Sequence, residues 1–171
     1  SDLTDIAMIE GGKFKVEKTS FNFSEIFKDF MPAIEITAGQ KNVVLDYANI
    51  DADVEVLGDK FRLSQVLQNL LTNAIKFTSA KGAVKLNTRI AGKWLYVYIK
   101  DSGIGIHPTE LKKVFERSYQ AKHQKDKKLT KMGWGFGLSI AQEIILQHNG
   151  EIAVDSRGLG HGSTFWFKIP I

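Results

Sequence analysis

The segment at residues 66–77, VLQNLLTNAIKF, constrains the fold of this chain more than any other stretch. Its apolar residues recur with a helical period, but Asn69, Asn73 and Lys76 interrupt them at spacings of four and three residues. Side chains at these spacings lie on one face of a helix, so a polar stripe follows a helix that is otherwise apolar enough for a core. The stripe either faces water or serves a binding site, and the helix alone leaves both readings open.

A second constraint is a carboxylate that the strand pattern turns toward the core. The odd positions of residues 94–101 are apolar up to Ile99, and the same parity carries Asp101 onto the apolar face. Burying a carboxylate without a partner is costly, so Asp101 must meet a donor or serve a function. It either caps the turn at Ser102 and Gly103 or binds a ligand.

Length and composition limit what these features can belong to. A chain of 171 residues suits one compact domain, and the absence of cysteine excludes disulfides, thiolate zinc sites and cysteine catalysis. No apolar run approaches the length of a membrane helix. The histidines lack metal-ligand spacing, so we predict no metal site built by the protein alone. They are His107, His123, His148 and His161.

The remaining periodicities predict an α+β fold. Asn22 and Asp59 are expected N-caps, each before a helix. The expected helices cover residues 1–10, 23–34, 60–77, 108–114 and 135–148, and the expected strands cover residues 13–16, 43–47, 54–56, 84–90, 94–101, 152–155 and 163–169. Residues 43–47 are expected to form a buried strand. Strand pairs alternating with helices indicate a two-layer α/β sandwich, in which helices cover one face of a mixed sheet.

A basic segment at residues 122–131 contains five lysines and His123. Such a run is typical of a solvated loop, of a nucleic-acid contact or of a site for the phosphates of a small ligand. The segment lacks interleaved aromatic residues, which disfavours nucleic acid, and we predict no nucleic-acid partner. Its charge and its lack of apolar periodicity predict a mobile loop.

Three blocks in this order resemble a known family. They are Asn69-x3-Asn73-Ala74-x-Lys76, Asp101-x-Gly103-x-Gly105 and Gly135-x-Gly137-Leu138. They resemble the N, G1 and G2 boxes of the ATP-binding catalytic domain of sensor histidine kinases, in the superfamily of gyrase, the ninety-kilodalton heat-shock chaperone and the mismatch-repair ATPases. Their order and spacing are far more specific than any one of them. The resemblance implies a Bergerat-type fold, with residues 13–171 as the catalytic domain and residues 1–12 as the end of the dimerization and phosphoacceptor helix.

The resemblance also implies ATP and Mg²⁺ as cofactors. Asp101 would accept a hydrogen bond from the amino group of adenine, Asn69 and Asn73 would offer oxygens to Mg²⁺, and Lys76 would meet phosphate. Asn69 and Lys76 would also be catalytic. The other residues expected at the nucleotide are Gly103, Gly105, Ile106, Phe115, Tyr119, Gly133, Gly135, Gly137, Leu138, Ser163 and Thr164. For Ser163 and Thr164 the alternative is that they are solvent-facing strand residues.

Asn69 indicates the reaction. Hydrolytic members of the superfamily carry Glu at this position to activate water, and an amide cannot act as a general base. The resemblance therefore implies transfer of the γ-phosphoryl group to a histidine of a dimerization domain outside this chain, followed by a response regulator. It further implies a monomeric fragment of a homodimeric parent on the cytoplasmic side of a membrane, and it leaves open whether the parent is anchored there.

The chain departs from the family pattern in two places. Residues 115–120 read FERSYQ, so Ser118 and Gln120 replace a common Phe and Arg, and that Arg is a candidate clamp for the γ-phosphate. The third box reads Met132-Gly133-Trp134-Gly135-Phe136-Gly137 in place of the usual Gly-Gly-Thr-Gly-Leu-Gly, with bulk where a small hydroxyl residue is common. The alternative to an active kinase domain is therefore a degenerate nucleotide-binding or partner-binding regulatory module.

Overall fold

The computed structural model describes residues 2–116 and 137–171, and the elements below belong to these ranges. The described helices are α1 (Asp2–Glu10), η1 (Phe23–Glu25), α2 (Ile26–Lys41), α3 (Lys60–Lys76), η2 (Pro108–Glu110) and α6 (Gly137–Gln147). The described strands are β1 (Thr19–Asn22), β2 (Val44–Asn49), β3 (Glu55–Gly58), β4 (Ala83–Ala91), β5 (Trp94–Asp101), β6 (Glu151–Asp155) and β7 (Ser163–Pro170).

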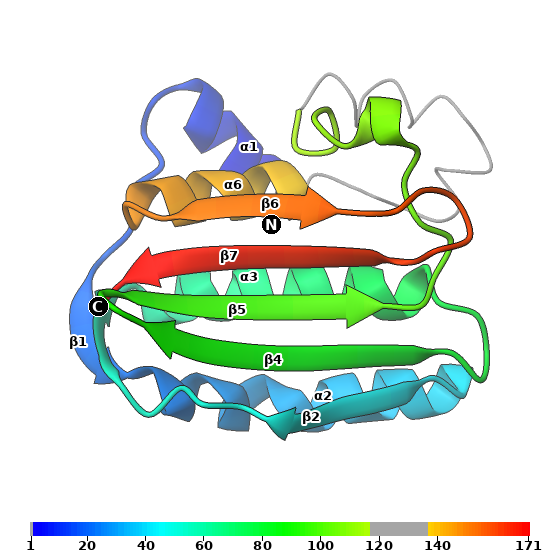
Figure 1. Cartoon of the computed structure of the whole chain (residues 1–171). Helices are drawn as coiled ribbons and strands as arrows, with labels where there is room; N and C mark the ends of the chain where they lie inside the picture. The colour runs from blue at the N-terminus through cyan, green and yellow to red at the C-terminus, as the bar shows by residue number, and fades with distance from the viewer. Residues whose placement is uncertain (1, 117–136) are drawn as a thin grey trace.

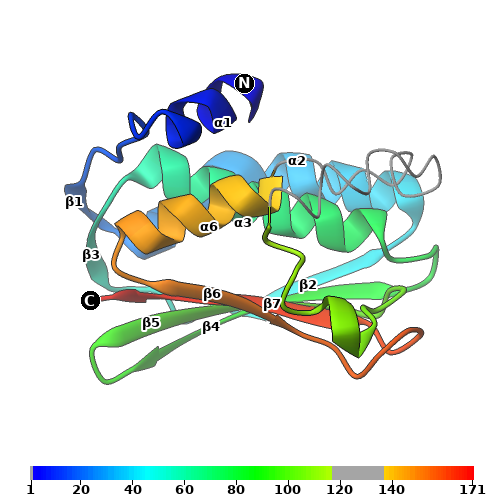
Figure 2. The ribbon, with the colours of Figure 1, turned by 90° about the horizontal axis from the view of Figure 1, so that it is seen from above.

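The main sheet has five strands in the order β2-β4-β5-β7-β6. β2 and β4 run parallel and the other neighbours run antiparallel, so the sheet is mixed. In Figure 1 this sheet faces the viewer with α2, α3 and α6 behind it, and Figure 2 shows the same two layers edge-on. The predicted α+β sandwich with helices on one face is confirmed. A separate pair, β1 and β3, lies beside the helix layer.

The core lies between the sheet and the helices. Alternate residues of β4, β5 and β7 point into it, and the apolar face of α3 fills its centre with fully buried side chains such as Leu63, Leu67 and Leu71. This arrangement follows from the periods of the two structures, two in the strands and 3.6 in the helix. The core therefore holds the end of β5 and the polar stripe of α3 in fixed positions.

The caps predicted at Asn22 and Asp59 are confirmed, although Glu25, at the N-cap position of α2, adds no side-chain cap of its own. The Asn22 side chain accepts a hydrogen bond from Ser24 N–H at 3.0 Å, at the start of the turn that leads into α2. The Asp59 side chain accepts from Arg62 N–H at 3.1 Å and so begins α3. Each carboxylate or amide oxygen satisfies a backbone donor that the first helical turn leaves unpaired.

Three expectations from the sequence are wrong. Residues 13–16 form no strand, because the Gln147 side chain hydrogen-bonds to Phe14 C=O and Val16 N–H in place of a neighbouring strand. The strand expected to be buried at residues 43–47 is β2, an edge strand on which Val44 is 60% exposed. The short helix expected at residues 108–114 is only the turn η2, which begins where the His107 ring accepts from Thr109 N–H.

The helix α1 packs on the body of the domain. Ile6 is buried, and the Asp5 carboxylate lies 2.9 Å from the Arg62 guanidinium of α3. Because α1 contacts the rest of the domain, the described structure shows no division between residues 12 and 13, and the domain boundary expected there stays a prediction. None of the helices in residues 2–116 and 137–171 combines the length and apolar character that crossing a membrane requires.

Candidate functional site

The candidate site is centred on Asp101, the last residue of β5. Its register partners are Val84 on β4 and Ser163 on β7, and the residue is 5% exposed, so the predicted inward orientation is confirmed. Its Oδ1 accepts from Gly103 N–H at 2.8 Å and from Ser163 N–H at 3.3 Å, and its Oδ2 accepts from the Ser163 hydroxyl at 2.7 Å. These donors hold the carboxylate in one orientation.

Burial raises the pKa of the Asp101 carboxyl group, and the hydrogen bonds from Ser163 and Gly103 lower it in part. The bond from Gly103 N–H shows that Asp101 does cap the turn, as one interpretation of the sequence had it. An ionised carboxylate can accept about four hydrogen bonds. The three that it accepts here leave capacity for a ligand, so the turn cap and a ligand contact are compatible.

The turn after Asp101 is joined to the end of α3. Ile104 N–H donates to Phe77 C=O at 3.2 Å, and a Cβ at Gly103 would lie 2.3 Å from the same carbonyl oxygen. Gly105 has φ +73°, a conformation that side chains disfavour. Gly103 therefore lets the backbone pass close to the end of α3, beside the carboxylate, and Gly105 lets it pass close to Gly158 in the loop between β6 and β7.

The polar stripe of α3 is only partly open to water. Asn73 is 9% exposed, and its side-chain amide makes no hydrogen bond to another described residue. Asn69 is half-buried, and its amide nitrogen lies 3.5 Å from Gly137 C=O at the start of α6. Lys76 is exposed at the last turn of α3. A buried amide without a partner is unusual, so Asn73 contradicts the view that the stripe simply faces solvent.

The apolar residues predicted for the site lie in the core at its border. Ile106 and Leu138 are buried, and Ile106 N–H donates to the Ser156 hydroxyl at 3.0 Å. Phe115 packs edge-on against Phe165, with ring centroids 6.1 Å apart. Ile106, Phe115 and Leu138 are each at most 9% exposed and form an apolar boundary of the site.

The two hydroxyl residues of β7 are separated by the strand period. Ser163 faces the core with Asp101, while Thr164 lies on the opposite face of the sheet, opposite Lys100 in the register. The structure therefore brings Ser163, Gly103 and Asp101 together and does not bring Thr164 to them. Tyr119, Gly133 and Gly135, with Gln120 and the lysines of residues 122–131, lie outside the described residues.

Two positions in this region were not identified from the sequence. The Ser156 hydroxyl accepts from Ile106 N–H and donates to Gly162 C=O at 2.7 Å, so it joins the turn after β5 to the loop between β6 and β7. The Phe77 carbonyl anchors Ile104, as described above. The position of Ser156 within a glycine-rich loop was the one sequence feature that could have indicated its role. The role of the Phe77 carbonyl has no counterpart in the sequence, because every residue carries a backbone carbonyl.

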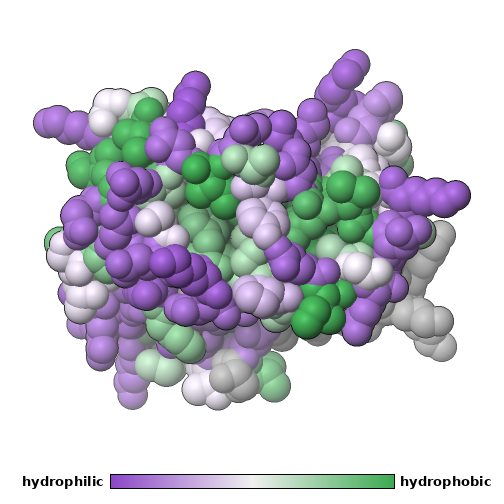
Figure 3. Space-filling model, turned by 90° about the horizontal axis from the view of Figure 1, so that it is seen from below, coloured by the Kyte–Doolittle hydropathy of each residue, from purple (hydrophilic) through white to green (hydrophobic). Residues whose placement is uncertain are grey.

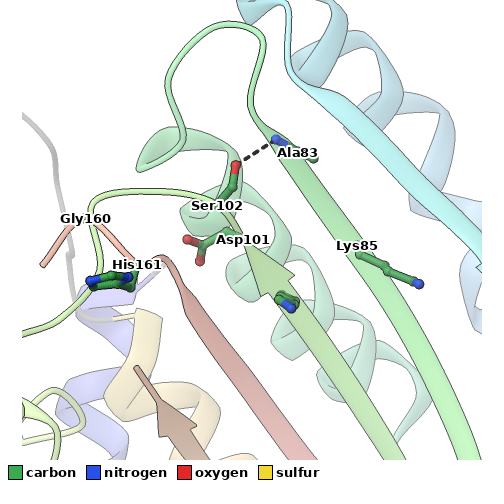
Figure 4. A pocket seen from close by; sticks show the side chains of 7 residues that line it. Ala83, Lys85, Asp101, Ser102, Gly160 and His161 are labelled. Atoms are coloured by element: carbon green, nitrogen blue, oxygen red, sulfur yellow. Dashed lines mark hydrogen bonds between the residues drawn. The ribbon is translucent and has the colours of Figure 1, made fainter. Parts of the chain in front are cut away.

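A hollow of about 420 Å³ opens at the end of β4 and β5. It is bordered by Asp101, Ser102, Lys85, Lys100 and His161, among others, and of the predicted residues only Asp101 borders it. Figure 4 shows the Ser102 side chain turned toward Ala83 and the Asp101 carboxylate pointing away from the side chain of Lys85. Within the described ranges, no group of three or more His, Cys, Asp or Glu residues could hold a metal.

Known proteins are similar to this chain in sequence and in fold. Residues 58–171 match the family model of the histidine kinase-, DNA gyrase B-, and HSP90-like ATPases. The sensor histidine kinase RcsC of Escherichia coli strain K12 is 35% identical to this chain over 173 residues, which cover 100% of this chain and 18% of RcsC. The chain thus spans less than a fifth of that curated relative.

Solved structures of histidine kinases superimpose on the fold. Full-length ShkA in complex with AMPPNP is 25% identical, with a TM-score of 0.80 over 99% of this chain and 34% of that chain. Histidine kinase ThkA in complex with the response regulator protein TrrA is 26% identical, with a TM-score of 0.76 over 98% of this chain and 46% of that chain. Sequence and architecture agree, and the chain belongs to the family of histidine kinase-, DNA gyrase B- and HSP90-like ATPases.

Proposed function

We propose that this chain is the catalytic domain of a sensor histidine kinase, which binds ATP with Mg²⁺ and transfers the γ-phosphoryl group to a histidine of a dimerization domain. The observation that carries the proposal is the buried Asp101 carboxylate, held by Gly103 and Ser163 beside the end of α3. ShkA, a structural relative, was solved in complex with AMPPNP, which supports a nucleotide as the ligand.

Asp101 suits the recognition of adenine. The exocyclic amino group of adenine is a donor, and a hydrogen bond to a charged acceptor contributes roughly 1.5–3 kcal/mol. Guanine carries an oxygen at the same position, which would face the carboxylate oxygen and repel it. The fixed orientation of Asp101 therefore favours ATP over GTP. Gly103 and Gly105 would let the base approach the backbone, with Ile106, Phe115, Leu138 and the Ser163 hydroxyl at the edges of the site.

The stripe of α3 suits the phosphates and the metal. The amide of Asn73 is buried and lacks a partner among the described residues, which is the condition of a ligand-binding group before its ligand arrives. Asn73 and Asn69 would hold Mg²⁺, which takes few protein ligands and neutralises phosphate charge. Lys76 adds positive charge on the same face. Gly137 begins α6, and Gly133 and Gly135 precede it, so their N–H groups are candidates for phosphate contacts.

The proposed reaction is transfer and not hydrolysis. A histidine nitrogen of the acceptor forms a bond to the γ-phosphorus, the bond from that phosphorus to the bridging oxygen breaks, and ADP leaves with its electrons. The Asn69 amide cannot deprotonate water, which disfavours attack by water. The contribution of this chain is to position the nucleotide and to stabilise the charge on the transferred group.

The partners follow from the same proposal. The acceptor is a dimerization domain outside this chain, and ThkA in complex with the response regulator TrrA supports a response regulator as the next partner. We propose a monomeric fragment within a homodimeric parent on the cytoplasmic side of a membrane. Thr164 stays a candidate site residue only if the nucleotide or a partner reaches the opposite face of the sheet.

The second candidate function is a regulatory module that binds nucleotide without transferring phosphate. Gln120 and Ser118, which replace the family's usual Arg and Phe, favour it. Incubating this chain with labelled ATP and a supplied dimerization domain distinguishes the kinase from the regulatory module. Acid-labile label on that domain supports the kinase, whereas ATP binding without transfer supports the regulatory module.

A further inference from the structure

The face of the main sheet that points away from the helices is bare in the described structure. The side chains of β4, β5 and β7 alternate between fully buried and partly exposed, and the partly exposed set forms this face. Figure 2 shows α1, α2, α3 and α6 on the other side of the sheet. We refer to the exposed side chains of these three central strands as the outer face.

Aromatic rings form the middle of the outer face. The rings of Tyr96 and Tyr98 are stacked with centroids 6.0 Å apart and an interplanar angle of 5°, and Trp166 lies 6.4 Å from Tyr96. All three residues, and Trp94, are only partly buried. Tyrosine and tryptophan are enriched at protein interfaces because they present a large rigid surface at low entropic cost.

Cations lie over these rings. The Arg89 guanidinium carbon is 5.4 Å from the Tyr96 ring centroid, and Lys168 Nζ is 4.3 Å from that of Trp94. Such cation–π contacts hold a positive charge at a defined position, and each stabilises the pair by about 0.5–1 kcal/mol at an exposed site. They also lie over the rings of Tyr96 and Trp94, which leaves less ring surface for stacking bases. These two rings therefore support cations, which favours a partner with carboxylates over nucleic acid.

Two further lysines lie beside the hollow at the end of β4 and β5. Lys85 and Lys100 are direct partners in the register, an arrangement in which like charges repel. Neither has an ion pair with another described residue, and both border the hollow of about 420 Å³. A carboxylate placed between them would relieve the repulsion.

The distribution of charge on the sheet defines the chemistry of a partner. The central strands carry Lys85, Arg89, Lys100 and Lys168 on the outer face and no acidic residue. The acidic residues on this side lie on the edge strands: Asp46 of β2, and Glu151 and Asp155 of β6. Glu151 already pairs with Lys168 at 3.7 Å. The complementary surface has carboxylates at its centre.

We infer that the outer face is a docking surface for an acidic surface of another protein domain. A membrane fits less well, since none of the exposed large apolar residues of the described structure lies on β4, β5 or β7. Apolar groups gather instead at the side formed by α2 and β2, seen in Figure 3. A second copy of this chain would offer the same cationic centre, with no carboxylate on the outer face of its central strands. The Asn69, Asn73 and Asp101 side chains lie on the helix side of the sheet, opposite the outer face, although Asp101 also borders the hollow beside Lys85 and Lys100.

Tryptophan fluorescence can test the inference on the intact chain. Trp94 and Trp166 lie on the outer face, and Trp134→Phe removes the third tryptophan. This protein is titrated with a short poly-glutamate peptide, with oligothymidylate and with phosphatidylserine vesicles. We expect the peptide to bind most tightly and to change the fluorescence, and its affinity to fall as salt is raised.

Charge reversal locates the binding. Lys85→Glu with Lys100→Glu should weaken peptide binding on the order of tenfold or more. The matched control, Lys15→Glu with Lys28→Glu, changes the net charge equally at exposed positions elsewhere and should bind almost as the parent does. Absent peptide binding, equal losses in both double variants, or tighter binding to oligothymidylate or vesicles would overturn the inference. ATP binding, measured in parallel, should be unchanged by the Lys85/Lys100 change.

Discussion

The Ser163 hydroxyl donates to Asp101 Oδ2 at 2.7 Å across the β5–β7 register, while its backbone N–H donates to Oδ1 at 3.3 Å. One residue thus contacts both oxygens of a buried carboxylate. Gly103 N–H adds a third donor at 2.8 Å. The carboxylate is held in place by the strand beside it and by its own turn, and these contacts do not depend on a ligand.

Replacing Asp101 with Asn should stabilise the free protein at neutral pH, by about 1 kcal/mol, because it removes a buried charge and keeps the acceptor for Gly103 and Ser163 N–H. Burial raises the pKa of Asp101, so the cost of ionising it is present above that pKa and disappears as pH falls through it. Urea unfolding over a pH series should therefore show the two proteins converging in acid. Asp155→Asn, an exposed control, should show no such gain; a destabilised Asp101→Asn protein would contradict this account.

Ser163→Ala should weaken ATP binding on the order of tenfold, about 1.4 kcal/mol, because the Ser163 hydroxyl orients the carboxylate proposed to accept from the base. Without the hydroxyl, the pKa of Asp101 rises further and the carboxylate is less well oriented. Thr164→Ala is the matched control, because Thr164 lies on the opposite face of the sheet. Calorimetric titration of both variants with ATP checks this. A larger loss of ATP affinity from Thr164→Ala than from Ser163→Ala would contradict the placement of the base on the Asp101 side of the sheet.

Asn73→Ala should reduce affinity for ATP with Mg²⁺ on the order of tenfold, about 1.4 kcal/mol, and affinity for metal-free ATP much less. The stability of the free protein should change little, because the amide has no hydrogen-bond partner among the described residues. Gln68→Ala, on the exposed side of the same helix, serves as the control. Equal losses with and without Mg²⁺ would remove Asn73 from the metal site.

His148 should make the fold sensitive to mild acid. The ring is 2% exposed; its Nε2 accepts from Asp59 N–H at 2.9 Å, and its Nδ1 lies 2.7 Å from Ile144 C=O. Burial lowers its pKa below 6.5, with a smaller lowering from Lys18, against the effects of the Ile144 carbonyl and Asp59. The free energy of unfolding should be fully maintained above pH 6.5 and decline as pH falls from there to the folded-state pKa.

Denaturant unfolding at several pH values measures this decline. His148→Gln should flatten the profile over that window, although it lowers stability at every pH by disturbing the start of α3. The control is His161→Gln, at an exposed position, which should keep the parent profile. Identical profiles for the parent and His148→Gln would show that another group governs the acid response.

Gln120→Arg should raise the rate of phosphoryl transfer to a supplied dimerization domain and leave ATP affinity nearly unchanged. A guanidinium stabilises the charge of the transferred group better than a neutral amide does. Each 1.36 kcal/mol of added transition-state stabilisation raises the transfer rate tenfold. Single-turnover transfer at saturating ATP is the measurement. Equal rates would show that a clamp at position 120 does not limit transfer.

The sequence predicted the features that local periods determine. The alternation in β5 correctly turned Asp101 inward, and the caps at Asn22 and Asp59 followed from residue type at a helix start. What failed depends on distant partners. Residues 13–16 alternate as a strand does, but their backbone is satisfied by Gln147 from α6. The exposure of β2 likewise follows from its place at the sheet edge, which no local pattern reveals.

The candidate site shows the same division. Boxes near in sequence, such as Asp101 with Gly103, could be grouped from their spacing alone. The contact between Asn69 and Gly137 joins α3 to α6 across the fold. The resemblance to a known family assigned both residues to the nucleotide site, but the sequence did not predict their contact. Ser156 was missed because its role is to join two loops through backbone groups.

The most direct test of the central claim is a calorimetric titration with a non-hydrolysable ATP analogue, with and without Mg²⁺. The account predicts Mg²⁺-strengthened binding to the parent protein, much weaker binding of the matching GTP analogue, and loss of ATP-analogue binding in Asp101→Asn although that variant stays folded. Equal binding of the two nucleotides, or unchanged binding by Asp101→Asn, would contradict the assignment of Asp101 as the group that recognises adenine.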